Sequence, residues 1–258
     1  MRHNERGSVR VRVTMDLTAW IGGSMATFVL VHGAFGGAHE FRLVRRKLMQ
    51  AGHDPYTPSL TGIGERVHLS GAEVCLRTHV EDVTNLVEYW DLRDIVLLGF
   101  SYGGMVVTGT LEHIADRVAH LVYLDAMVPK NGESLDGLVG RSRSTALGTP
   151  WLMDPLPRTP SPYDDPVEEA FNAPRRTPQP IKTFADAVVL DRPLEDYPFT
   201  RTFIRATGEA REPTHPSQRF SDHARTSPQW RYHEIDSNHI IPSNRPNELV
   251  AILLELVR

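Results

Sequence analysis

The chain has 258 residues, of which 40% are apolar, and this composition supports one domain with a sizeable core and excludes disorder as the main state. The net charge is −4 with no basic stripe, which argues against nucleic acid, and no stretch approaches the roughly 18 apolar residues of a membrane span. The single cysteine, Cys75, cannot form an intrachain disulfide, so no oxidising compartment is indicated. We expect a cytoplasmic protein with a small-molecule partner and neither a nucleic-acid nor a membrane partner, and we leave a homodimer open.

The first 24 residues contain arginines but no apolar core of the length that a secretory signal needs. Leu17 to Ile21 is too short for this role and follows Asp16. We predict that residues 1–24 form a loosely attached extension and that residues 25–258 form one domain. Two alternatives are a true start at Met25 and an added strand.

Strands and helices alternate through the first half of the chain. Apolar, β-rich runs predict strands, and apolar residues three or four positions apart predict helices. The expected elements are a strand over 27–31, a helix over about 41–48, a weak strand over 53–60, a helix opened by a Thr78/Glu81 capping box, a strand over 95–98, a helix over 105–114 and a strand over 121–124.

The pattern then breaks over residues 126–199, which contain 12 of the 19 prolines. A structureless loop of this length is improbable in a compact domain, so we predict a lid of short helices. Beyond it we expect a strand over 202–206, a helix near 218–224, a strand over 230–235 and a last helix capped by Asn244. This order predicts an α/β fold with a mostly parallel central sheet and helices on both faces.

Residues 99–103 match the pattern G-x-S-x-G between a predicted strand and a predicted helix. This context places Ser101 on a sharp turn, with the N-terminus of the following helix directed at the site. The glycine-rich stretch 33–37 follows the first strand and can aim N–H groups at a developing oxyanion. We expect the backbone N–H groups of Ala34 and Tyr102 to form this oxyanion hole, and a structural role for His32.

His239 is the favoured general base among the 12 histidines, because it follows the last strand and precedes the last helix. The acid that orients its ring is either Asp125 or Glu209. Asp125 ends an apolar strand, where a carboxylate has little structural reason to lie, so it is the preferred candidate. No histidine pair has zinc-type spacing with acidic or cysteine partners, so we expect no metal.

At these residues the chain resembles the α/β-hydrolase superfamily. It looks most like the small esterase branch that also contains plant methyl-ester hydrolases and hydroxynitrile lyases. The segments that carry the resemblance are 27–38, 59–70, 97–106, 121–129 and 237–249. The resemblance implies Ser101 as nucleophile and His239 as base. In many relatives the acid is an aspartate at the place that corresponds to Glu209 here, whereas Asp125 matches the placement in other branches.

The resemblance also separates this chain from its neighbours. Haloalkane dehalogenases and epoxide hydrolases use an aspartate where this chain has Ser101. Hydroxynitrile lyases of this type use a threonine in the first loop and commonly a lysine after the histidine, where this chain has Gly33 and Ile240. Cyanohydrin cleavage is therefore disfavoured.

The sequence thus predicts a cofactor-free serine hydrolase that cleaves a small to medium, partly apolar carboxylic ester or lactone through an acyl-enzyme. The alternatives are a lyase, a carbon–carbon hydrolase or a perhydrolase on the same site, and a catalytically silent receptor. Phe35 and Trp151 are the candidate substrate-binding residues. Leu152, Met153, Leu156 and Phe171 either line the same pocket or pack the lid onto the core.

Overall fold

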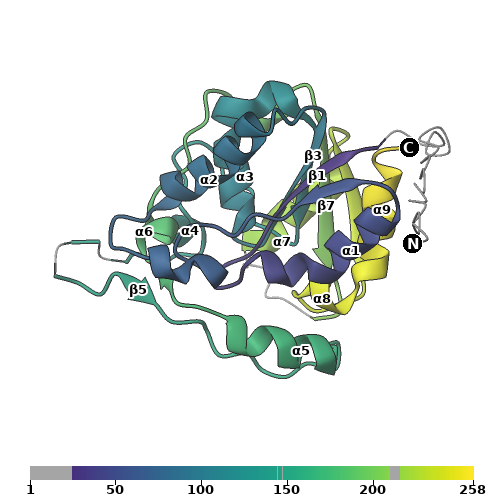
Figure 1. The fold of residues 1–258 in the computed structure, drawn as a ribbon. Coiled ribbons are helices and arrows are strands. Elements are labelled where there is room, and N and C mark those ends of the chain that lie inside the picture. The colour runs from purple at the N-terminus through teal and green to yellow at the C-terminus, as the bar shows by residue number, and fades with distance from the viewer. Residues whose placement is uncertain (1–24, 144, 147, 210–215) are drawn as a thin grey trace, which may run out of the picture.

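The computed structural model describes residues 25–143, 145–146, 148–209 and 216–258, so the extension predicted over 1–24 lies outside the described residues. Six parallel strands form a central sheet in the order β2-β1-β3-β4-β7-β8 (Figure 1). The expected mostly parallel sheet is therefore confirmed. The strands are β1 (Thr27–Val31), β2 (Asp54–Tyr56), β3 (Ile95–Phe100), β4 (Val118–Leu124), β7 (Thr200–Ala206) and β8 (Trp230–Ile235).

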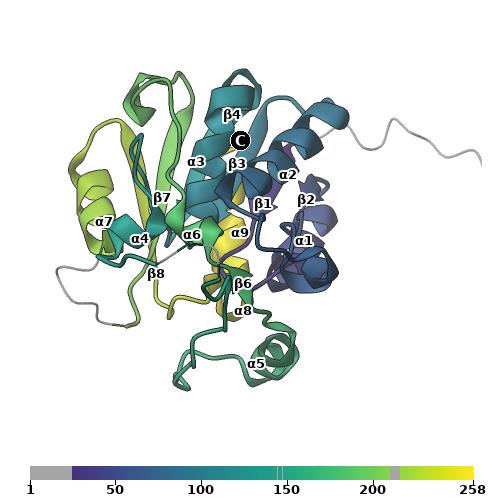
Figure 2. The same ribbon diagram turned by 90° about the vertical axis from the view of Figure 1, so that its left-hand side faces the viewer.

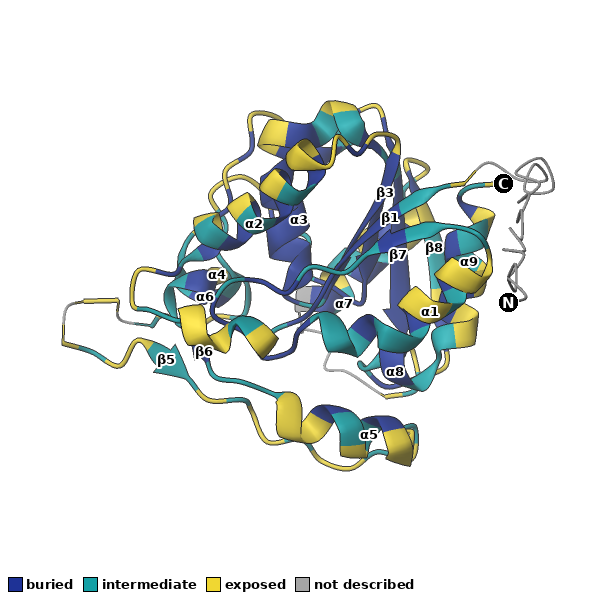
Figure 3. Cartoon of the chain, viewed as in Figure 1, coloured by how far each residue is buried: buried dark blue, intermediate teal, exposed yellow. Residues whose placement is uncertain are grey.

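Helices cover both faces of this sheet (Figures 1 and 2). One face packs against α2 (Leu76–Tyr89), α3 (Gly103–Ile114) and α7 (Pro216–Thr226), and the other against α1 (Arg42–Gln50), α8 (Ile241–Asn244) and α9 (Pro246–Glu255). Successive strand residues point to opposite faces, so each strand contributes to both cores. The inner strands and α3 are accordingly the most buried parts of the molecule (Figure 3). No helix in the described part of the chain combines the length and apolarity needed to cross a membrane.

The order of the strands creates a crevice at one edge of the sheet. The chain runs from β1 to the edge strand β2 and then returns to the other side of β1 as β3. The connections that leave β1 and β3 therefore diverge onto opposite faces, which opens a crevice beyond the carboxyl ends of these strands. The G-x-S-x-G turn and the glycine-rich loop both lie there.

A long insertion, residues 125–199, connects the neighbouring strands β4 and β7. Its regular elements are short: α4 (Leu135–Leu138), β5 (Leu152–Met153), α5 (Pro166–Asn172), β6 (Gln179–Pro180) and α6 (Lys182–Ala185). Besides the expected short helices, it contains an antiparallel pair formed by β5 and β6. The part that carries α5 lies outside the two helical layers, next to α8 (Figures 1 and 2).

Two predicted helix caps are wrong. The helix α2 begins at Leu76, three residues earlier than the Thr78/Glu81 box implies. Its N-cap is Cys75, whose N–H donates a hydrogen bond to Thr78 Oγ1 at 3.3 Å. Asn244 does not cap α9, which begins without a side-chain cap. Its amide instead bonds Asn238 and the N–H of Asp165, because these partners are fixed by the packing of the insertion against α8.

Arg42 on α1 holds α5 against the body of the molecule. Its guanidinium donates two hydrogen bonds to the buried carboxylate of Glu168, and its charge lies 4.1 Å from the centre of the Phe171 ring. A buried carboxylate without this partner is strongly unfavourable. The pair therefore ties the insertion to the first helix of the sheet.

Arg42→Met should release α5 locally and cost about 1–3 kcal/mol, because it leaves the Glu168 carboxylate buried and unpaired. Limited proteolysis with mass spectrometry should show faster cleavage within residues 155–176. The double variant Arg42→Met/Glu168→Met removes the buried charge and should recover most of the protection. Arg46→Met, at an exposed position on the same helix, is the control, and equal cleavage in it would contradict this role.

Candidate active site

Ser101 lies on a strained turn between β3 and α3. Its φ is +54°, in the left-handed region that non-glycine residues seldom adopt. Two close approaches need the flanking glycines, because a Cβ at Gly99 would lie 2.6 Å from the Gly103 oxygen, and one at Gly103 would lie 2.6 Å from the Val31 oxygen. The turn therefore fits only this spacing of glycines and holds Ser101 at the crevice.

A chain of two hydrogen bonds links Ser101, His239 and Asp125. His239 Nε2 lies 2.9 Å from Ser101 Oγ, and His239 Nδ1 lies 2.6 Å from Asp125 Oδ2. His239 belongs to the loop between β8 and α8, and its ring packs 4.9 Å from that of Phe100. The residues that the sequence singled out as nucleophile, base and acid thus meet in space.

Asp125 directly follows β4 and has no exposed side-chain surface. Its Oδ1 accepts a hydrogen bond from the N–H of Ala206 at 3.3 Å and lies 3.8 Å from the Arg205 guanidinium. Its backbone also adopts a positive φ, +46°, which turns the chain away from the sheet. Glu209, the other candidate acid, is exposed at the rim of the cavity, and His239 directs Nδ1 to Asp125 instead.

The backbone N–H groups of Ala34 and Tyr102 flank Ser101, one after β1 and one after β3. Within the described part of the chain, neither donates a hydrogen bond to another group. The neighbouring Phe35 is clamped by the insertion, because its N–H bonds Gln179 Oε1 at 2.8 Å and its oxygen accepts from the Thr177 N–H at 3.0 Å. These two hydrogen bonds support Phe35 at φ +64°. The backbone N–H of Ala34 therefore stays available to a ligand, whereas that of Phe35 does not.

Two buried histidines brace the loops around the site. His32 Nε2 accepts from the N–H of Leu60 at 3.1 Å, in agreement with its expected structural role. His79 Nε2 donates to the Thr61 oxygen at 2.9 Å, so its Nδ1 accepts from the Tyr102 hydroxyl at 2.8 Å. Burial lowers the pKa of each ring to about 4, so both rings are neutral near pH 7.

A cavity of about 570 Å³ opens over Ser101 and His239. The strand loops line one side, largely with apolar groups, and the insertion adds charged and polar side chains on the other. The polar lining includes Glu40, Arg158, Asn172, Arg176, Glu209, Asn238 and Ser243.

The expected substrate-binding residues Phe35 and Trp151 do not line this cavity. Phe35 is buried, with its ring 5.8 Å from that of Phe184, because the insertion's hydrogen bonds turn it inward. Trp151 precedes β5 and lines a separate hollow with Ile181 and Lys182. Phe171 is held by Arg42 and Arg175. The aromatic residues of the insertion therefore pack or face solvent rather than surround the nucleophile.

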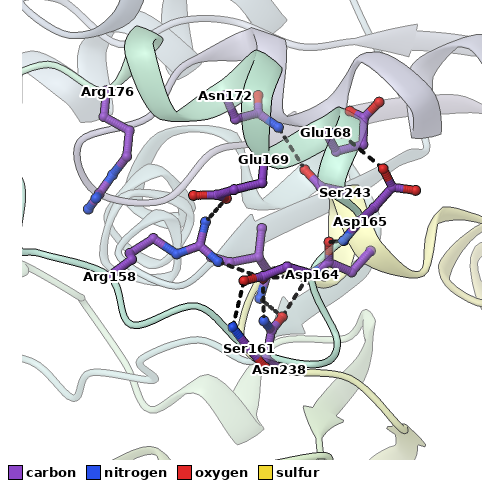
Figure 4. Close-up of polar contacts among 12 residues, drawn as sticks. Arg158, Ser161, Asp164, Asp165, Glu168, Glu169, Asn172, Arg176, Asn238 and Ser243 are labelled. Carbon is purple, nitrogen blue, oxygen red and sulfur yellow. Dashed lines mark hydrogen bonds and ion pairs between the residues drawn. The ribbon is translucent and has the colours of Figure 1, made fainter.

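A polar network joins the insertion to the loop that carries His239 (Figure 4). Asn238, the residue before His239, donates to Asp164 Oδ1 at 2.7 Å. Asp164 also pairs with Arg158, and Asn172 donates to Ser243 at 3.1 Å. These contacts limit the freedom of the loop and therefore help to place the imidazole.

The sequence did not predict the polar residues of the insertion, nor Asn238, as part of the site. Asn238 could have been found from its position beside His239, but Arg158 and Arg176 lie in a proline-rich stretch without periodicity. Among the described residues, no group of three or more His, Cys, Asp and Glu side chains is arranged to hold a metal ion.

Comparison with known proteins places this geometry in a family. A model of the alpha/beta hydrolase family matches residues 28–252. A carbendazim hydrolyzing esterase from Nocardioides sp. (strain SG-4G) is 49% identical over 118 residues, which are 46% of this chain and 49% of that protein. The chain thus matches about half the length of this curated relative.

Solved structures share the fold. An extracellular alpha/beta-hydrolase from a Paenibacillus species superposes with a TM-score of 0.71 at 21% identity, over 90% of this chain and 99% of that chain. A methylesterase from Arabidopsis superposes with a TM-score of 0.69 at 23% identity, with the same shares covered. These similarities establish the architecture on which the site is built.

The buried histidines predict that acid weakens the fold. The unfolded chain binds a proton at each ring near pH 6.5, whereas the native rings resist protonation down to about pH 4, so the contribution is complete above 6.5 and is lost as the pH falls from 6.5 to 4. Each ring should account for up to about 3 kcal/mol. Burial raises the pKa of Glu40 to about 7, which opposes this effect over the same pH range, so the histidine contribution is isolated by comparing variants in urea unfolding between pH 7 and 5.

His79→Gln is the matched variant for this measurement. It should be less stable at pH 7 and should lose less stability on acidification, because one of the two rings no longer titrates. An unchanged slope in this variant would show that other groups cause the acid sensitivity.

Proposed function

The chain belongs to the alpha/beta hydrolase family, and we propose that it is a serine hydrolase of carboxylic esters. The observation that carries this proposal is the hydrogen-bonded series Ser101–His239–Asp125 beside two open backbone N–H donors. The esterase from Nocardioides that shares 49% identity over part of the chain supports the same class of reaction. The activity rests on residues of this chain alone and requires no cofactor.

The first half of the reaction forms an acyl-enzyme. His239 Nε2 takes the hydroxyl proton of Ser101 as Oγ attacks the ester carbonyl, and the carbonyl oxygen becomes an oxyanion. The N–H groups of Ala34 and Tyr102 hold that oxyanion, assisted by the N-terminal end of α3. His239 then gives its proton to the leaving alcohol. Asp125 orients the ring and stabilises its charged form.

The second half releases the acid. The neutral His239 removes a proton from a water molecule, which attacks the acyl carbonyl, and the tetrahedral intermediate collapses to regenerate the Ser101 hydroxyl. The same donors stabilise both oxyanions. The strained turn keeps Oγ in line with the imidazole throughout, so little reorganisation accompanies either step.

The cavity supports a small to medium substrate. Its volume of about 570 Å³ lies within the range typical of small-molecule sites. The wall near Ser101 is largely apolar, with Gly33, Ala34, Phe100 and Ile240, whereas the insertion's wall is polar. A partly apolar ester with a polar group away from the scissile bond fits this division. In this proposal the insertion acts as the lid that encloses the substrate.

A fluorophosphonate probe should form a stoichiometric adduct on Ser101, located by mass spectrometry, and His239→Ala should abolish it. Ser101→Ala should lower turnover of p-nitrophenyl butyrate by at least about 10³-fold. Ser101→Gly is a second variant, because glycine accepts the positive φ without strain. An adduct elsewhere, or activity retained in both folded variants, would refute the mechanism.

Asp125→Asn should lower kcat on the order of 10³- to 10⁴-fold, because an amide can stabilise neither the correct tautomer nor the imidazolium. Asparagine tolerates the left-handed backbone of this position, so the fold should persist. Glu209→Gln should change kcat less than about twofold, because that carboxylate is exposed and Nδ1 of His239 is directed elsewhere. The reverse order of effects would assign the acid to Glu209.

A further inference from the structure

Two arginines of the insertion, Arg158 and Arg176, line the cavity, and their surroundings differ. Arg158 is matched by carboxylates, since it pairs with Asp164 at 2.9 Å and also with Glu169 (Figure 4). These ion pairs neutralise the charge of Arg158 within the insertion and hold α5 to the preceding loop. It offers little attraction to a ligand.

Arg176 forms no ion pair with any carboxylate in the described part of the chain. One of its guanidinium nitrogens donates to the Leu156 oxygen at 2.9 Å, and Figure 4 shows the side chain apart from the contacts around Arg158. The side chain is half-buried, and this burial, followed by the nearby Arg158, lowers its pKa. An arginine nevertheless keeps its charge in proteins, and most of its five N–H donors remain free for an oxygen ligand.

Glu40 is the carboxyl group that faces the same space from the strand side. Its Oε2 is buried and has no hydrogen-bond partner among the described residues. Burial raises the pKa of Glu40 to about 7, against the opposing effects of the Gly33 backbone and of Arg176 and Arg158. Glu40 and Arg176 affect each other's pKa but form no ion pair among the described residues, and Glu40 is largely protonated below neutral pH.

We propose that Arg176 is a substrate-binding residue that selects esters with a carboxylate, or a similar anionic oxygen group, away from the scissile bond. The inference rests on the proposed ester hydrolysis and names its substrate class. A half-buried guanidinium at a cavity wall binds a carboxylate through charge-assisted and often bidentate hydrogen bonds. The apolar wall near Ser101 would then hold the reacting end of the same molecule.

Matched ester pairs test this proposal. One pair carries the charge on the acyl side, p-nitrophenyl hydrogen adipate against methyl p-nitrophenyl adipate. The other carries it on the alcohol side, 4-acetoxybenzoate against 4-acetoxybenzamide. The wild type should show the lower KM for the anionic member of at least one pair. Arg176→Met should raise that KM about 10- to 100-fold, while KM for the neutral member and both kcat values change less than about twofold.

Three further variants sharpen the result. Arg176→Lys keeps the charge and should restore part of the preference. Arg175→Met, at the exposed neighbouring position outside the cavity, should leave every KM unchanged. Glu40→Gln should lower KM for the anionic ester at pH 8, because it removes a competing negative charge. Equal losses for the charged and neutral esters in Arg176→Met, or no loss for the charged ester, would overturn the proposal.

A binding measurement separates this proposal from the proposed catalysis. Calorimetry on Ser101→Ala with monomethyl adipate and dimethyl adipate requires no turnover. Tighter binding of the monoester, lost in Ser101→Ala/Arg176→Met, supports the anionic subsite even if no ester is hydrolysed. Equal binding of the two adipate esters, together with equal binding of 4-acetoxybenzoate and 4-acetoxybenzamide, overturns the subsite, although hydrolysis of neutral esters that depends on Ser101 would leave the reaction class intact.

Discussion

Asp125 carries a carboxylate without exposed surface at the end of β4, and a charge in that position has to be matched by donors from the surrounding strands. The adjacent strand β7 supplies the N–H of Ala206 and the guanidinium of Arg205, and the loop after β8 supplies His239. Three neighbouring strands, β4, β7 and β8, must therefore be in register before the Asp125 carboxylate has all of these partners. The geometry of the site thus depends on the spatial order of the strands, which places β4, β7 and β8 side by side.

The insertion serves both structure and site. Glu168 and Arg42 attach α5 to the first helix, and Asp164 attaches the preceding loop to Asn238. Because Asn238 adjoins His239, the segment that forms the polar wall of the cavity also restrains the His239 ring. A change in the wall therefore reaches the imidazole through the Asn238–Asp164 hydrogen bond and the adjoining backbone rather than through the sheet.

The sequence was most informative where local chemistry is decisive. The bounds of β1 and β8 agree with those predicted. β1 is a short apolar run that ends at His32 and Gly33, whereas β8 mixes aromatic and polar residues and ends at a polar turn over Asp236 and Ser237. Ser101 and His239 could be located because a glycine pattern and the order along the chain constrain them. The contacts of the insertion could not be predicted, since they depend on partners far apart in the chain: Phe35 and Gln179 are separated by 144 residues. The same distance explains why Phe35 was expected in the pocket and instead points into the core.

Thr177 and Gln179 hydrogen-bond to Phe35, so the part of the insertion that contains them supports the loop after β1. This part therefore tolerates replacement by another sequence less well than the part before it. A graft that replaced the whole of residues 125–199 would remove both partners of a residue at φ +64°, a conformation that costs about 1–3 kcal/mol without support. The loop after β1, which carries Ala34 and Phe35, would then relax along with the graft. An exchange confined to residues 155–176 that keeps Asp164 and Glu168 would leave the support of Phe35 in place, whereas 177–183 belong, in functional terms, to the loop that follows β1.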